Sequence, residues 1–171
     1  MTLQQYHTCS QESRASFRKD VIRGLSALQK SLEPKYFYDA AGDELFRQIM
    51  QSPEYYVTAA EREILTQQSD QILDACLRYK AHFDIIELGA GDASKSVYLL
   101  ERALQRNISH RYYPVDISEN TIAYLQQLLP ERLPGMHTEG FAGEYFEMLA
   151  QVNAISKAPK LVLFLGATIG N

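Results

Sequence analysis

The 171-residue sequence contains no tryptophan, only two cysteines, and no apolar run long enough to span a membrane. Cys9 and Cys76 lie far apart in the chain, so they suggest neither a disulfide framework nor a zinc-binding pattern. The N-terminus lacks the basic and apolar segments of a secretory signal. We therefore expect a protein of the reducing cytoplasm that has no membrane partner.

An excess of basic residues is also missing. The chain has 17 Lys and Arg against 21 Asp and Glu, for a net charge of −4. This balance argues against nucleic acid as a partner, because nucleic-acid binders carry a basic surface. The four histidines, at positions 7, 82, 110 and 137, show no metal-ligand spacing, and we expect no metal site. With 46% hydrophobic and 22% charged residues, an ordinary globular domain is expected.

Residues 1–81 are predicted to form a helical region that contributes to a substrate pocket. Helical spacing of apolar residues, including Phe17 and Leu28, predicts a first helix that Pro34 ends. Gly42 is expected to break the chain before a short helix. Thr58 and Glu61 have the spacing of a capping box, which predicts one long helix from Thr58 to about Cys76. Glu61 is interpreted only as part of that cap.

The pattern changes at Phe83, after which short apolar runs alternate with helical segments. Strands are predicted near 83–88, 111–116 and 160–165, with a weaker one near 135–139. Ser118 is expected to cap a helix. Alternation of this kind predicts an α/β fold with a parallel sheet over residues 82–171.

The clearest local signal is the turn in Ile86-Glu87-Leu88-Gly89-Ala90-Gly91-Asp92-Ala93-Ser94. Gly89 and Gly91 allow a tight turn that a ligand can approach closely, and a helix start follows. Asp116 ends the next strand, where a carboxylate can accept hydrogen bonds from two ribose hydroxyls. Together these features predict a nucleoside-containing cofactor. In the alternative interpretation, the glycines only tighten the turn and Asp116 only caps a helix.

Dinucleotide-binding turns usually have a third glycine, where this chain has Ser94. The E-L-G-A-G-D sequence resembles instead the motif of class I S-adenosylmethionine-dependent methyltransferases. An NAD-type oxidoreductase domain is thus a less favoured alternative.

Four segments, in matching order, resemble the histidine-specific N-α-methyltransferase family of ergothioneine biosynthesis. They are Tyr36-Phe37-Tyr38-Asp39-Ala40-Ala41-Gly42, Pro53-Glu54-Tyr55-Tyr56-Val57-Thr58, the turn Glu87–Lys95, and Leu165-Gly166-Ala167-Thr168-Ile169-Gly170-Asn171. The resemblance covers roughly residues 17–171. It implies a class I methyltransferase (Rossmann-like) fold and transfer of methyl groups from S-adenosylmethionine to the α-amine of an amino acid, with L-histidine as the first candidate.

The resemblance also assigns site residues. Gly89, Lys95 and Asp116 match cofactor-binding positions, Phe141 lies near another, and Gly91 belongs to the same turn. Tyr38, Tyr55 and Asn171 match positions that contact the amino-acid substrate. Tyr56 is expected to pack in the core, and Lys95 could instead be a surface lysine. No catalytic side chain is assigned, since methyl transfer can depend largely on positioning and desolvation.

The predicted sheet is incomplete, with about four strands where the fold normally has seven. The apolar strand at 161–165 is then expected to form an exposed edge, which predicts self-association or a longer protein. The chain could be an N-terminal portion of an amino-acid N-methyltransferase, a methyltransferase for another amine, or a non-catalytic cofactor-binding fragment.

Overall fold

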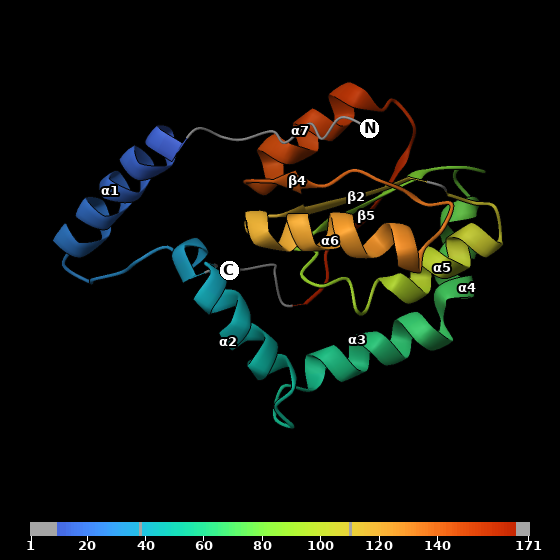
Figure 1. Ribbon diagram of the computed structural model, residues 1–171, viewed down its shortest axis with the longest axis horizontal. Coiled ribbons are helices and arrows are strands. Elements are labelled where there is room, and N and C mark those ends of the chain that lie inside the picture. Colours follow the sequence, from blue (N-terminus) through green and yellow to red (C-terminus); the bar gives the residue numbers. More distant parts are fainter. Residues whose placement is uncertain (1–9, 38, 110, 167–171) are drawn as a thin grey trace.

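The computed structural model describes residues 10–37, 39–109 and 111–166. Within these ranges, four α-helices precede the first strand, and strands then alternate with helices except that the third and fourth strands follow each other directly (Figure 1). The helices are α1 (Ser10–Ser26), α2 (Ala40–Met50), α3 (Tyr56–Gln67), α4 (Ser69–Leu77), α5 (Val97–Gln105), α6 (Glu119–Arg132) and α7 (Tyr145–Ile155), with a short 3₁₀ turn at Pro34–Phe37. The division into regions 1–81 and 82–171 stays a prediction.

All the strand pairs in the described part of the chain are parallel, as the sequence predicts. The strand order is β3-β2-β1-β5, and β4 pairs with β2 beyond the end of β3. The strands are β1 (Asp84–Leu88), β2 (Arg111–Asp116), β3 (His137–Thr138), β4 (Phe141–Ala142) and β5 (Lys160–Leu163). The expected α/β class I methyltransferase fold is therefore confirmed.

The sheet separates two apolar clusters because successive side chains of a strand point to opposite faces. Ile85 of β1 packs with side chains of α5 and α6, including Leu99 and Leu125. Its neighbour Ile86 packs on the other face with Met148 of α7. Helices on both faces leave the two ends of the parallel strands for ligand binding.

The outer edge of β5 is unpaired among the described residues, and it is apolar. Within the described sheet, β5 hydrogen-bonds only to β1. Val162 is 46% exposed and Phe164, just after the strand, is 38% exposed. This agrees with the exposed apolar edge that the sequence predicts.

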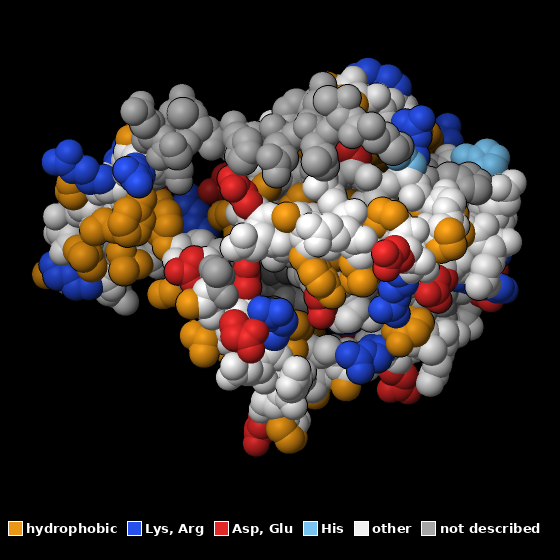
Figure 2. All heavy atoms as spheres, in the orientation of Figure 1, with side chains coloured by type: hydrophobic (Ala, Val, Ile, Leu, Met, Phe, Trp, Pro, Cys, Tyr) orange, Lys and Arg blue, Asp and Glu red, His pale blue; other side chains and the backbone are white. Residues whose placement is uncertain are grey.

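Helix α1 lies apart from the sheet in Figure 1, and apolar side chains gather on its surface in Figure 2. Phe17 and Leu25 of this helix are both exposed. The Phe17 ring packs edge-on against Tyr36, with the ring centroids 4.7 Å apart. The helix ends at Ser26 rather than near Pro34, so Leu28 lies outside it and is fully exposed.

Three local expectations were wrong. Gly42 lies inside the first turn of α2, where its amide donates to Asp39 Oδ1 at 2.8 Å. The long helix is divided into α3 and α4 at Gln68. Tyr56, expected in the core, is the first residue of α3 and is 73% exposed.

Ser118 caps α6 as predicted, since its Oγ accepts a hydrogen bond from the Thr121 amide at 3.2 Å. None of the helices in the described ranges has the combined length and apolarity of a membrane span.

Candidate functional site

The candidate site lies where the carboxyl ends of β1, β2, β4 and β5 meet at one edge of the sheet. Parallel strands bring the loops that follow them together at this edge, which is where α/β sheets bind ligands. The loops that matter here follow β1, β2 and β5.

The turn after β1 has an unusual backbone. Gly89, Gly91 and Ala93 all have positive φ angles, of 72°, 54° and 54°. Gly89 and Ala90 both donate their amides to the Val115 carbonyl, at 2.8 and 3.1 Å, which fixes the turn on β2. A Cβ placed on Gly91 would meet nothing within 4 Å, so open space lies beside this turn. Glycine suits position 91 because of its φ and not because of crowding.

Asp116 joins this turn to the end of β2. Its Oδ2 accepts from the Gly91 amide and its Oδ1 from the Ser118 amide, both at 3.0 Å. A carboxylate has roughly four lone-pair positions, and these amides use only part of them, so Asp116 can accept further hydrogen bonds. Burial raises the pKa of Asp116 above its usual value, and the charge of Asp43 raises it further. The arrangement offers fixed acceptor positions that suit a pair of vicinal hydroxyls.

Asp43 brings helix α2 to the same edge. Its Oδ2 accepts a hydrogen bond at 2.6 Å from the hydroxyl of Ser118, which lies two residues after Asp116. No local sequence pattern predicts this contact, because Asp43 and Ser118 are 75 residues apart.

Glu61 was wrongly interpreted as part of a capping box. Helix α3 begins at Tyr56, and its N-cap, Tyr55, makes no side-chain hydrogen bond. Glu61 is therefore well inside the helix, and its carboxylate reaches the site instead. Its Oε2 accepts from Lys95 Nζ at 2.6 Å, and its Oε1 accepts from the Gly166 amide at 2.6 Å.

Lys95 is not the free surface lysine of the alternative interpretation. Its side chain is 14% exposed and that of Glu61 is 20% exposed. The lysine ammonium thus lies at the junction of the loops that follow β1 and β5. A cation held there can pair with an anionic group of a ligand.

Glu87 lies beneath the turn and is fully buried. Its Oε2 accepts from the Tyr112 hydroxyl at 2.5 Å. Burial raises the pKa of Glu87 from 4.5 to about 7, although hydrogen bonds from Ser96 and Tyr112 act in the opposite direction. Glu87 therefore supports the turn from below, where burial separates it from solvent.

The other residues assigned from the resemblance have different positions. The Phe141 side chain is buried against Tyr113, at 6.1 Å between ring centroids, so it belongs to the core. Tyr55 lies at the start of α3 and packs edge-on against Phe46 at 6.1 Å. Tyr38 and Asn171 lie outside the described residues. The cofactor and substrate roles of all these residues stay predictions.

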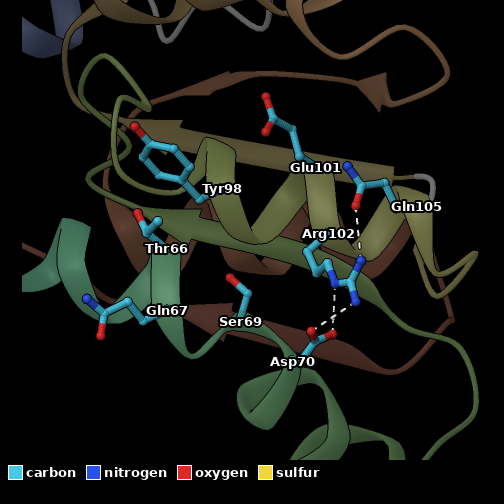
Figure 3. A pocket seen from close by; sticks show the side chains of 8 residues that line it. All are labelled: Thr66, Gln67, Ser69, Asp70, Tyr98, Glu101, Arg102 and Gln105. Carbon is cyan, nitrogen blue, oxygen red and sulfur yellow. Dashed lines mark hydrogen bonds and ion pairs between the residues drawn. The ribbon is translucent and has the colours of Figure 1, made fainter.

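A separate polar pocket of about 180 Å³ lies between α5 and the region where α3 meets α4 (Figure 3). In it, Arg102 donates to both carboxylate oxygens of Asp70, at 2.8 and 2.9 Å, and to Gln105 at 3.2 Å. Arg102, Asp70 and Gln105 therefore satisfy one another within this pocket.

Comparison with known proteins identifies the relatives of this chain. Residues 17–171 match the family model described as histidine-specific methyltransferase, SAM-dependent. The histidine N-alpha-methyltransferase of Mycolicibacterium smegmatis is 35% identical over 172 residues, which cover 100% of this chain and 52% of that protein. The 4-dimethylallyltryptophan N-methyltransferase of Claviceps purpurea is 29% identical over 162 residues, covering 91% of this chain and 46% of the relative.

The ergothioneine biosynthesis protein 1 of Schizosaccharomyces pombe is 30% identical over 139 residues, covering 78% of this chain and 18% of that protein. The chain thus spans about half the length, or less, of these relatives. Its own match to the family model extends over most of its residues. The chain therefore belongs to the family of histidine-specific, S-adenosylmethionine-dependent methyltransferases.

Proposed function

We propose that this chain forms the cofactor-binding part of an enzyme that transfers methyl groups from S-adenosylmethionine to the α-amine of an amino acid, with L-histidine as the first candidate substrate. The observation that carries the proposal is the Asp116 carboxylate, held by the Gly91 and Ser118 amides beside an open glycine turn. The family match and the name of the M. smegmatis relative support the chemistry and the substrate.

The side chains present fit this cofactor. Asp116 would accept hydrogen bonds from the two ribose hydroxyls, and the space beside Gly91 would admit the nucleoside. Lys95 would pair with the carboxylate of the methionyl group. S-adenosylmethionine has no pyrophosphate, so it needs less of the anion-binding amide cradle that a dinucleotide-binding turn provides.

The bound cofactor would supply a methyl group on a positively charged sulfur, and the substrate amine would attack its carbon. The protein then needs to hold both molecules in line and keep water out. Tyr38, Tyr55 and Asn171 are the proposed contacts for the amino acid. Tyrosine rings suit the methylated ammonium product through cation–π attraction.

A second substrate class is favoured by one observation. The C. purpurea relative carries the name of a methyltransferase for 4-dimethylallyltryptophan, so another aromatic amino acid is an alternative to histidine. The two possibilities would be separated by titrating the chain with histidine and with tryptophan in the presence of S-adenosylhomocysteine, the demethylated cofactor. The amino acid that binds more tightly would identify the preferred substrate class.

The proposed site can be tested by calorimetric titration of the 171-residue chain with S-adenosylmethionine and with its demethylated product, S-adenosylhomocysteine. We expect saturable binding of both, and a dissociation constant about 10- to 100-fold weaker in Asp116→Asn, which loses a charged acceptor. Glu131→Gln, at an exposed position of α6, should bind like the wild type. A folded wild-type chain that binds neither compound would refute a working cofactor site in this chain.

A further inference from the structure

The Glu61 carboxylate connects three segments that are distant in sequence. It extends from the middle of α3, and its two oxygens bind different loops, Lys95 after β1 and the Gly166 amide after β5. A contact that only attached α3 to the sheet could involve any nearby group. Glu61 instead contacts Lys95, the lysine that follows the glycine turn after β1. The geometry therefore points to a role in the site itself.

Lys95 lies in an unfavourable position without this partner. It stands just before α5, which begins at Val97, and the amino end of a helix disfavours a positive charge. Its side chain has four flexible bonds and would lose considerable freedom when ordered by a ligand. The Glu61 carboxylate both compensates the charge and orders the side chain before a ligand arrives.

The place where Lys95 is held is tightly defined. A Cβ at Gly166 would lie 2.9 Å from Lys95 Nζ, so glycine at 166 leaves room for the ammonium. Gly166 also has a φ of 70°, which suits glycine. An ammonium has three donors, and Glu61 uses one of them, so the group keeps capacity for an anionic ligand.

We propose that Glu61 is a positioning residue for recognition of the amino-acid half of the cofactor. It orients the Lys95 ammonium toward the carboxylate of that half, and it ties the loop after β5 to the same point. This inference rests on the proposed function, because it assumes that a cofactor with an amino-acid group binds beside Gly91 and Asp116. It adds a residue from the helical region to the cofactor site.

Two ligands separate this role from a general structural one. S-adenosylhomocysteine carries the nucleoside and the amino-acid half, whereas 5′-methylthioadenosine carries the nucleoside without any carboxylate. The 171-residue chain and its variants would be titrated calorimetrically with each compound, and the midpoint of thermal unfolding would be recorded for every variant. Glu61→Gln keeps an acceptor for the Gly166 amide but removes the charge that holds Lys95.

We expect Glu61→Gln to bind S-adenosylhomocysteine about tenfold more weakly and 5′-methylthioadenosine as the wild type does. Lys95→Met should show the same selectivity with a larger loss. The double variant should resemble Lys95→Met alone, since Glu61 then has no ammonium to orient. Glu63→Gln is the matched control, because Glu63 is exposed on the same helix and contacts Gln67.

Several results would overturn the inference. One is that Glu61→Gln weakens the binding of both ligands equally or of neither. Another is that the losses of the two single variants add in the double variant. A third is that Glu61→Gln binds S-adenosylhomocysteine more tightly, which would mean that Glu61 competes with the ligand for Lys95. If Glu61→Gln fails to fold, the ligand selectivity of Lys95→Met decides the question. A folded wild-type chain that binds neither ligand refutes the proposed cofactor site as well, whereas normal wild-type binding with unaffected variants refutes this inference alone.

Discussion

A buried carboxylate next to the glycine turn makes the stability of the fold depend on pH. Glu87 has its pKa raised from 4.5 to about 7, mainly because burial disfavours its charged form. Folding therefore favours the protonated form of the Glu87 carboxyl group. Protonated Glu87 adds its full contribution to the free energy of unfolding below about pH 4.5. This contribution is lost as the pH rises through about 7, where Glu87 ionises in the folded state.

We expect Glu87→Gln to remove this loss. A glutamine does not ionise, so the difference in unfolding free energy between variant and wild type should shift in favour of the variant by about 3 kcal/mol between pH 4.5 and 8. Urea unfolding at several pH values would measure it, with Glu63→Gln as a control. Because the pKa of Asp116 is also raised, some pH dependence of the same sign should remain. Parallel pH profiles for Glu87→Gln and the wild type would contradict this account.

The sequence identified some site residues and missed others for a simple reason. Asp116 and the glycine turn belong to local strand and turn patterns, so their place at the sheet edge could be predicted. Glu61 and Asp43 act through partners that are 34 and 75 residues away in the chain. No local pattern encodes such contacts, and the spacing of Thr58 and Glu61 even suggested a cap that the structure does not contain.

At the scale of single elements, the start of α2 depends on close backbone contact. A Cβ at Gly42 would lie only 1.6 Å from the Phe37 carbonyl oxygen, so the 3₁₀ turn and the helix could not keep their present approach. The glycine was expected to end a segment. It instead allows two segments to pack together, a need that the sequence pattern alone does not reveal.

We expect Gly42→Ala to destabilise the chain by about 1 to 3 kcal/mol, because the added methyl forces backbone movement. Movement of α2 would also withdraw Asp43 from Ser118 and, under the proposed function, weaken cofactor binding. Urea unfolding and calorimetric titration would measure the two effects. Ala41→Gly, at the neighbouring exposed position, should cost only about 1 kcal/mol of helix propensity. If Gly42→Ala is as stable as the wild type, the close contact does not constrain α2.

Element boundaries show the same limit of sequence analysis. The parallel strands and the Ser118 cap were predicted because apolar runs and capping residues are local signals. The two-residue strand β4 was missed, since Phe141–Ala142 is too short to produce a pattern. The division between α3 and α4 was also missed, because the apolar spacing continues across Gln68.

At the scale of the whole molecule, the outer edge of β5, which no other described strand pairs with, predicts association. An unpaired apolar strand edge is a template for pairing with another chain. We expect sedimentation velocity of the 171-residue chain to show concentration-dependent dimers or larger species. Val162→Lys should reduce them, because a lysine on an edge strand opposes such pairing.

Tyr124→Lys offers a matched control, since Tyr124 is also exposed but lies on α6. It should leave association unchanged. A wild-type chain that sediments as a single monomer at all concentrations would rule out association through this edge.

The position of β1 also determines when the sheet can form during synthesis. β1 lies between β2 and β5 and pairs with both, yet Lys160 follows Leu88 only after most of the α/β region has been made. At about 5 to 20 residues per second, a ribosome would need roughly 4 to 15 seconds to reach β5. Throughout that time, one side of the strand that carries the glycine turn would lack its partner. A nascent chain of this protein therefore has a defined interval in which a chaperone that covers apolar strands would be useful.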